Sequence, residues 1–143
     1  MTHEERSAGV IVFRLAGHSW DEAQFLLLNY GKYWDYAKGH VEKGEDDRTA
    51  ALRELQEETG ITQVAMIDAF SKEIAYFFRS KRGLVRKSVI FFLGQVASAD
   101  IQLSDEHVGY EWLPFDAAMQ RVGYASAKEV LKAAKDFLDT SGH

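Results

Sequence analysis

Glu54, Glu57 and Glu58 are spaced so that a helix would carry all three carboxylates on one face, because positions three and four apart are neighbours on a helix surface. Carboxylates held this close repel one another, and the pKa of at least one rises unless a cation compensates. Mg²⁺ and Mn²⁺ prefer such oxygen ligands, keep several waters and bridge to phosphate groups. The spacing therefore indicates metal-assisted phosphate chemistry, although three glutamates alone also fit an acidic helix face in water.

Signals for both ends of this helix flank the glutamates. Asp46 and Asp47 suit its start, where carboxylates cap free N–H groups and meet the positive end of the helix dipole. Gly60 suits the left-handed position just after the last turn. We therefore expect a helix over Asp46–Thr59. Its apolar face, next to the glutamates, would pack on a sheet and carries Ala51, Leu52, Leu55 and Thr59.

The rest of the chain alternates between strand-like and helical segments. Apolar and β-branched runs predict strands at Ser7–Leu15, Gln24–Tyr30, Ile61–Phe70, Lys72–Arg79, Lys87–Val96 and Gly109–Leu113. Gly31–His40 is expected to be a loop, and the basic segment Ser80–Arg86 an exposed hairpin tip. Helices are expected from Pro114 to Gln120 and over Ser126–Leu138. The apolar face of the last helix carries Val130, Leu131, Ala134 and Leu138. This order predicts an α/β layered fold, with a single domain over residues 1–143.

The composition excludes several classes of protein. The 143 residues contain no cysteine, which rules out a disulfide framework and a thiolate metal site. No apolar run approaches the roughly 18 residues of a membrane span, and the N-terminus lacks the layout of a secretory signal. The net charge of −5 argues against a general nucleic-acid binder, but not against a phosphate substrate held through Mg²⁺. We expect a cytoplasmic monomer with a small-molecule substrate, no membrane partner and no nucleic-acid partner.

Residues Gly39–Ile61 resemble the signature of the Nudix hydrolases at every position. The pattern is glycine, five residues, Glu45, seven residues, Arg53-Glu54, an apolar and any residue, two glutamates, any residue, glycine and an apolar residue. So many fixed positions in one short segment make the match highly specific. The resemblance implies an α/β/α sandwich around a central mixed sheet, with an ion pair between Arg53 and Glu45. It also implies a set of metal ligands, namely the carboxylates of Glu54, Glu57 and Glu58 and the backbone carbonyl of Lys38.

Segments outside this signature resemble the asymmetric diadenosine tetraphosphate hydrolases of the animal and archaeal type. The matching segments include Phe25–Leu28, Tyr33–Trp34, Phe70–Tyr76, Lys87–Val89, Leu103–His107 and Tyr110–Leu113. The likeness implies cleavage of dinucleoside polyphosphates, above all diadenosine tetraphosphate to ATP and AMP, with Mg²⁺ (or Mn²⁺) as cofactor. The signature alone leaves other substrates open: another nucleoside polyphosphate, a diphosphoinositol polyphosphate or an RNA 5′ end.

The likeness also implies roles for polar residues outside the acidic helix. Glu106 is the expected fourth carboxylate of the metal cluster, and either it or Glu58 would act as general base. By itself, the sequence around Glu106 also fits a helix cap or a polar turn. Lys87, His40 and Lys81 are expected to bind phosphate. The alternatives are that a strand lysine guards a sheet edge and that a lone histidine is only hydrogen-bonded in place.

Tyrosines are the expected contacts to the base. Tyr76 and Tyr124 match positions where aromatic rings sandwich adenine, and such stacking contributes about 1–3 kcal/mol per base. Tyr33, just before Trp34, is a further candidate for substrate binding. Tyrosines in strands or at helix edges also commonly pack in the core. The narrower substrate assignment therefore depends on residues outside the signature.

Overall fold

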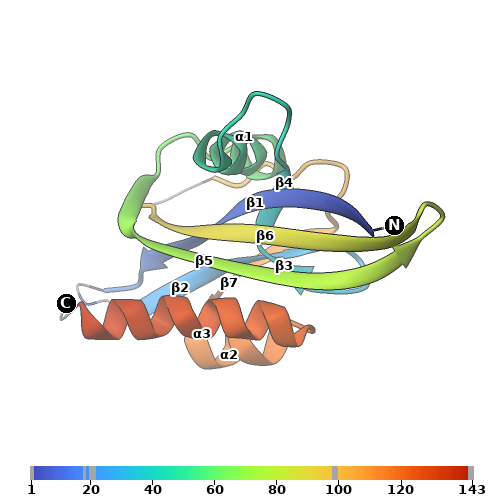
Figure 1. The fold of residues 1–143 in the computed structure, drawn as a ribbon. Helices are drawn as coiled ribbons and strands as arrows, with labels where there is room; N and C mark the ends of the chain where they lie inside the picture. The colour runs from blue at the N-terminus through green and yellow to red at the C-terminus, as the bar shows by residue number, and fades with distance from the viewer. Residues whose placement is uncertain (1, 18, 20–21, 98–99, 142–143) are drawn as a thin grey trace.

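A seven-stranded mixed sheet lies at the centre of the molecule, with helices on both of its faces (Figure 1). The computed structural model describes residues 2–17, 19, 22–97 and 100–141. Helix α1 (Asp47–Thr59) covers one face, and helices α2 (Phe115–Arg121) and α3 (Ala125–Thr140) cover the other. The expected α/β/α sandwich is therefore confirmed. The strands are β1 (Thr2–Leu15), β2 (Ala23–Asn29), β3 (Trp34–Asp35), β4 (Ala37–His40), β5 (Ala65–Ser80), β6 (Gly83–Gln95) and β7 (Gly109–Pro114).

Strand β1 holds the sheet together because it has partners along both edges. One edge pairs in parallel with β6 over residues 2–13. The other edge pairs antiparallel with β4 over residues 7–10 and with β2 over residues 13–15. Since β3 pairs with the far end of β2, β3 and β4 lie where β1 and β2 separate. This arrangement places Lys38, Gly39 and His40 beside both β1 and α1.

Alternation along the strands divides the core into two layers. In β1, Val10 and Val12 lie in the layer under α1, whereas Ile11 and Phe13 lie in the layer under α2 and α3. Successive side chains of a strand point to opposite faces, so a strand covered on both faces must be apolar throughout. The run Phe25–Leu28 in β2 alternates between the same two layers, which explains its continuous apolar character.

Helix α1 begins and ends where the sequence predicts. The Asp46 side chain accepts a hydrogen bond of 2.7 Å from the backbone N–H of Thr49, and Gly60 takes the left-handed conformation with a φ of 78°. The expected apolar face is confirmed, although Leu52 on its margin is partly exposed. The buried residues of the helix are Ala50, Ala51, Leu55, Glu58 and Thr59. One of the glutamates therefore points into the protein rather than into water.

The last helix also has the expected apolar face, since Val130, Leu131, Ala134 and Leu138 are all fully buried. Pro114 precedes α2 as its N-cap residue. Among the described residues, no helix is both long and apolar enough to cross a membrane.

The loop expected over Gly31–His40 is wrong. Residues 31–40 contain β3 and β4, which are too short for an alternation pattern to reveal. The exposed hairpin tip expected at Ser80–Arg86 is present, because Ser80 pairs with Gly83 across an exposed two-residue turn; residues 83–86 already belong to β6. Gly83 permits this tight turn with a φ of 110°. In addition, β5 continues through Ser71 with a shift in pairing register instead of breaking into two strands.

Candidate active site

Glu58 is a buried carboxylate on the face of α1 that packs on the sheet, and it is only 3% exposed. The hydroxyl of Tyr30 donates a hydrogen bond of 3.0 Å to its Oε1, but Oε2 has no hydrogen-bond partner among the described residues. Burial raises the pKa of this carboxyl to about 8; repulsion from Glu54 and Glu106 adds to the rise, and the Tyr30 hydroxyl and the backbone N–H of Lys38 oppose it. A buried oxygen without a partner indicates a place for a ligand.

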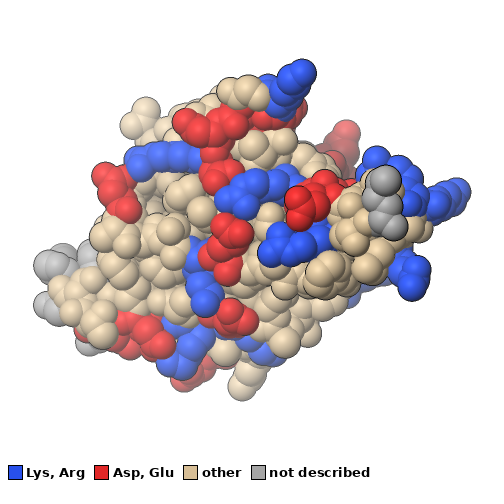
Figure 2. Space-filling model, viewed as in Figure 1, with Lys and Arg blue, Asp and Glu red and all other residues tan. Residues whose placement is uncertain are grey.

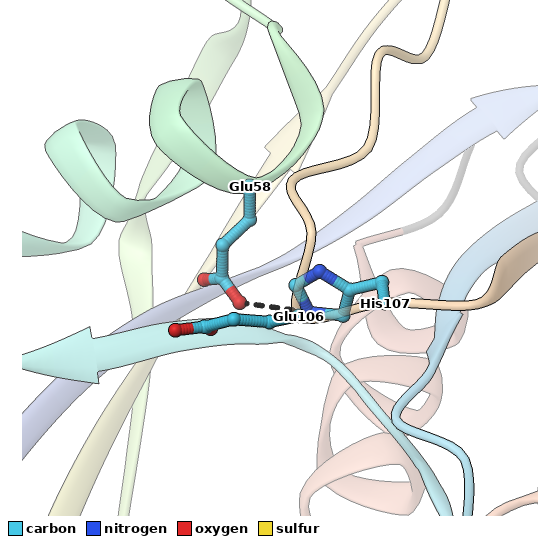
Figure 3. A group of neighbouring side chains, drawn as sticks. All are labelled: Glu58, Glu106 and His107. Atoms are coloured by element: carbon cyan, nitrogen blue, oxygen red, sulfur yellow. Dashed lines mark ion pairs between the residues drawn. The ribbon is translucent and has the colours of Figure 1, made fainter.

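Glu106 and His107 approach Glu58 from the loop before β7 (Figure 3). One potential ligand atom from each of the three residues lies within 4.8 Å of the others. Nε2 of His107 is 3.1 Å from Glu58 Oε1 without hydrogen-bond geometry, while Nδ1 lies 3.0 Å from the Ser104 hydroxyl. Burial lowers the pKa of His107, with Glu106 opposing, so the neutral imidazole is favoured. The sequence interpretation included Glu106 but missed its neighbour His107.

Glu54 reaches the same region across the backbone of β4. A Cβ placed on Gly39 would lie 2.1 Å from Glu54 Cδ, so the carboxylate occupies the space that a side chain there would fill. Arg53 donates to Glu54 (3.0 Å) and makes two hydrogen bonds to Glu45 (2.7 and 3.0 Å). The hydrogen bonds that Glu45 accepts from Arg53 and from the backbone N–H of Glu42 lower its pKa to about 2. The ion pair implied by the Nudix resemblance is therefore present.

Glu57 lies on the exposed side of this group. Its side chain is 56% exposed and pairs with Arg53 at 3.2 Å. Its negative charge contributes to the raised pKa of Glu54, for which burial is the larger cause. The helix spacing therefore brings the three glutamates together, but in different environments.

A polar cavity of about 390 Å³, here called the carboxylate cavity, lies beside these glutamates. It is lined by Ser7, Lys38, Gly39, His40, Glu42, Glu54, Lys87 and Glu106. Predicted phosphate-binding residues and predicted metal ligands therefore line the same cavity. The side chain of Lys87 is mostly buried, which lowers the pKa of its ammonium group, and Glu5 at 3.7 Å opposes this change. The cavity thus combines acidic and basic groups.

A second, mostly apolar pocket of about 470 Å³, here called the tyrosine pocket, adjoins this cavity. It is lined by Tyr33, Asp35, Lys38, Ile74, Tyr76, Phe91, Tyr124 and residues 125–127. The three tyrosines predicted to bind substrate therefore share one pocket. Tyr33 and Tyr124 meet edge to face, with centroids 5.3 Å apart, and Tyr76 and Tyr124 are 40% and 53% exposed. Lys38 lines both spaces, and its Nζ donates to Asp35 at 2.5 Å.

Lys81 is the predicted site residue that the structure leaves apart from the others. Within the described part of the chain it lines neither cavity. It lies in the turn at the free end of the β5–β6 hairpin, roughly 16 Å beyond Tyr76 at about 3.3 Å per residue. This end of the hairpin carries Arg79, Lys81, Arg82 and Arg86, and Figure 2 shows basic side chains gathered at this end of the molecule.

The fold and the site together define the class of this protein. The NUDIX domain family matches residues 3–134, so the chain belongs to this family and is a Nudix hydrolase. The asymmetrical bis(5′-nucleosyl)-tetraphosphatase of Rattus norvegicus is 37% identical, over 93% of this chain and 95% of the rat protein. The enzyme of the same name from Caenorhabditis elegans is 33% identical, over 93% of this chain and 96% of its own length.

Solved structures agree with these sequence relatives. A crystal structure of a C. elegans Ap4A hydrolase binary complex matches with a TM-score of 0.83 and 30% identity, over 95% of this chain and 98% of that chain. An Escherichia coli dihydroneopterin triphosphate pyrophosphohydrolase, at 22% identity and a TM-score of 0.71, shares the fold. The comparisons confirm the likeness to asymmetric diadenosine tetraphosphate hydrolases that the sequence indicates.

Proposed function

We propose that the protein hydrolyses dinucleoside polyphosphates with Mg²⁺ or Mn²⁺ as cofactor, above all diadenosine tetraphosphate to ATP and AMP. One observation carries the proposal: the carboxylate cavity and the tyrosine pocket share Lys38. A base in the tyrosine pocket would therefore direct its phosphate chain toward the carboxylates. The similarity to asymmetrical bis(5′-nucleosyl)-tetraphosphatases over nearly the whole chain supports the same substrate class.

Glutamates would hold the metal, because a bound cation would offset the repulsion between their carboxylates. Oε2 of Glu58 is buried and, within the part of the chain that the structure describes, lacks a hydrogen-bond partner. Glu54 and Glu106 repel the Glu58 carboxylate, and such oxygen donors fit a hard divalent cation. Glu57 and the Lys38 carbonyl complete the proposed ligand set. When bound, the cation neutralises phosphate charge and lowers the pKa of a bound water.

Side chains of the chain itself position the substrate. Tyr76 and Tyr124 stack on the adenine ring, and Tyr33 forms the adjoining wall of the pocket. Lys87 and His40 face the polyphosphate in the carboxylate cavity, where an ammonium group offsets the charge of the leaving phosphate chain.

A carboxylate acts as general base. Glu58 and Glu106 are the two candidates, because both lie at the proposed metal cluster. The carboxylate takes a proton from the attacking water, the new bond to a bridge phosphorus forms in line, and the bond to the leaving oxygen breaks. Cleavage next to one adenosine 5′-phosphate gives AMP and ATP.

A second candidate is a larger polyanion, either a diphosphoinositol polyphosphate or an RNA 5′ end. The basic end of the β5–β6 hairpin, with Lys81 in its turn, is the observation that favours it. Such a ligand would have to extend along the hairpin from the carboxylate cavity. Lys81→Ala should then weaken binding of the larger polyanion without changing the hydrolysis of diadenosine tetraphosphate.

The test is a substrate panel with product identification. The purified protein is incubated with Mg²⁺ and, separately, diadenosine tetraphosphate, a nucleoside triphosphate, a damaged nucleoside triphosphate, a diphosphoinositol polyphosphate or a triphosphorylated RNA. Products are resolved by chromatography. Equal amounts of ATP and AMP from the dinucleotide support the proposal. Two ADP molecules, faster turnover of another substrate, or binding without turnover would each overturn it.

A further inference from the structure

Tyr30, just after β2, contacts both the buried carboxylate of Glu58 and Tyr33 of the tyrosine pocket. Its hydroxyl is 3.0 Å from Glu58 Oε1 and 3.2 Å from the backbone oxygen of Tyr36. Its ring stacks on Tyr33, with centroids 5.0 Å apart and planes within 8°. The ring of His107 meets it edge to face at 4.4 Å. The Tyr30 ring is therefore held by aromatic contacts while its hydroxyl is directed at the carboxylate.

The hydroxyl can fix the orientation of the Glu58 carboxylate. A phenol has one proton to donate, and hydrogen bonds to an ionised acceptor are stronger than those to a neutral carbonyl. When Glu58 is ionised, its Oε1 is therefore the preferred acceptor. Oε1 is then engaged, whereas Oε2, for which the described residues supply no partner, stays available to a cation.

The side chain of His107 is also close to this carboxylate but does not orient it by a hydrogen bond. Nε2 of His107 is 3.1 Å from Oε1 but lacks hydrogen-bond geometry. Its ring instead packs against the ring of Tyr30, and its Nδ1 lies beside the hydroxyl of Ser104. Among the described side chains, the Tyr30 hydroxyl is thus the one that donates a hydrogen bond to Glu58.

We propose that Tyr30 is a positioning residue for the metal site: its hydroxyl holds Oε1 of Glu58 so that Oε2 is presented to the cation. The inference rests on the proposed function in one respect, because it takes Glu58 as a metal ligand. Groups that orient a metal ligand in this way typically change metal affinity by about 10- to 100-fold when removed.

The test measures Mn²⁺ binding directly, from the spectrum of free Mn²⁺ in a titration without substrate. Tyr30→Phe keeps the aromatic contacts and removes the hydroxyl, and it should weaken Mn²⁺ binding about 10- to 100-fold. Tyr36→Phe is the matched control, because it also removes a buried hydroxyl, which donates to the backbone oxygen of Ala127 at 2.6 Å. Its Mn²⁺ affinity should stay within about twofold of the wild-type value.

A double variant separates positioning from a general loosening of the fold. In Glu58→Gln the ionised acceptor is gone, so adding Tyr30→Phe should change Mn²⁺ affinity by no more than about twofold. In the Tyr30→Phe single variant, which keeps Glu58, saturating Mn²⁺ should also recover part of the lost kcat, with KM little changed.

The outcomes distinguish this inference from the proposed function. If the wild-type protein binds no Mn²⁺, the metal-dependent function itself fails. If the wild-type protein binds Mn²⁺ and Tyr30→Phe binds it equally well, the positioning role is wrong. Equal weakening by Tyr36→Phe, or an equal effect of Tyr30→Phe in the Glu58→Gln background, would also overturn it.

Discussion

In the group formed by Glu58, Glu106 and His107, two buried polar atoms, Glu58 Oε2 and His107 Nε2, have no hydrogen-bond partner among the described residues. In the adjoining tyrosine pocket, by contrast, Tyr33 and Tyr124 are in contact without a ligand, and side chains of the protein form a complete apolar wall. The first region gathers like charges that a bound cation would offset, whereas the second is preformed in shape. Changes in the first should therefore alter turnover, and changes in the second should alter substrate affinity.

The largest expected effect is on turnover at the acidic end. Glu54→Gln keeps the size of the side chain but removes the charge of a proposed metal ligand, so kcat should fall by about 10²- to 10⁴-fold with KM changed only slightly. Steady-state kinetics with diadenosine tetraphosphate measure both constants. Glu111→Gln, an exposed substitution on β7, is the control and should leave kcat unchanged. A kcat for Glu54→Gln within tenfold of wild type would contradict the division of roles.

Gly39→Ala should displace the carboxylate of Glu54 without changing its chemical identity. The added Cβ would lie 2.1 Å from Glu54 Cδ, so the carboxylate must move, and a misplacement of about 1 Å costs roughly 100-fold in rate. Gly39 is not in the left-handed region, so the backbone should accept alanine. Kinetics and thermal denaturation together test this prediction. A large loss of stability, with kcat per folded molecule preserved, would show that the glycine serves the fold.

Tyr76→Ala should affect the other half of the site. Loss of one stacking surface for the base should raise KM about tenfold, and kcat should stay within about twofold because uniform binding energy is removed. Tyr76→Phe keeps the aromatic face and should retain most of the affinity. The comparison between the two regions breaks down if Tyr76→Ala lowers kcat as strongly as Glu54→Gln does.

The smallest effect concerns stability without metal. The carboxyl of Glu58 titrates near 4.5 when unperturbed and at about 8 in the folded protein. Between these values the folded state binds the extra proton, so the free energy of unfolding should fall as pH rises from 4.5 to 8. Glu58→Gln should weaken this dependence and be more stable at pH 8 by about 1–3 kcal/mol.

Urea denaturation in the presence of a chelator, at pH 5 and pH 8, measures this difference between wild type and Glu58→Gln. Adding Mg²⁺ should reverse the order at pH 8, because the cation stabilises the ionised wild-type carboxylate. An identical dependence on pH in both proteins would show that the burial of Glu58 has no energetic cost.

Local signals made α1 predictable, and contacts between distant segments made the rest of the site hard to predict. Asp46 and Gly60 are adjacent to the helix that they cap, so the sequence suffices to locate its ends. Tyr33, Tyr76 and Tyr124 come from three separate segments of the chain, and only the family resemblance brought them together. The helical spacing of the glutamates also could not reveal that Glu58 is buried and Glu57 exposed, since this depends on the sheet beneath.

Tyr30 and His107 were missed for the same reason. Their importance depends on where Glu58 lies, and no short-range pattern encodes that contact. Strands β3 and β4 were also unpredictable from alternation, because each is formed by pairing with β2 or β1 and not by its own few residues.

The first and the last glycine of the signature segment, Gly39 and Gly60, constrain evolution in different ways. Gly60 has a φ of 78° and is favoured by the backbone itself, whereas Gly39 is required by the space that Glu54 occupies. A descendant of this chain that had lost catalysis would be released from the second constraint but not from the first. The loss of the first glycine with retention of the last should therefore mark inactive members of the family in sequence collections.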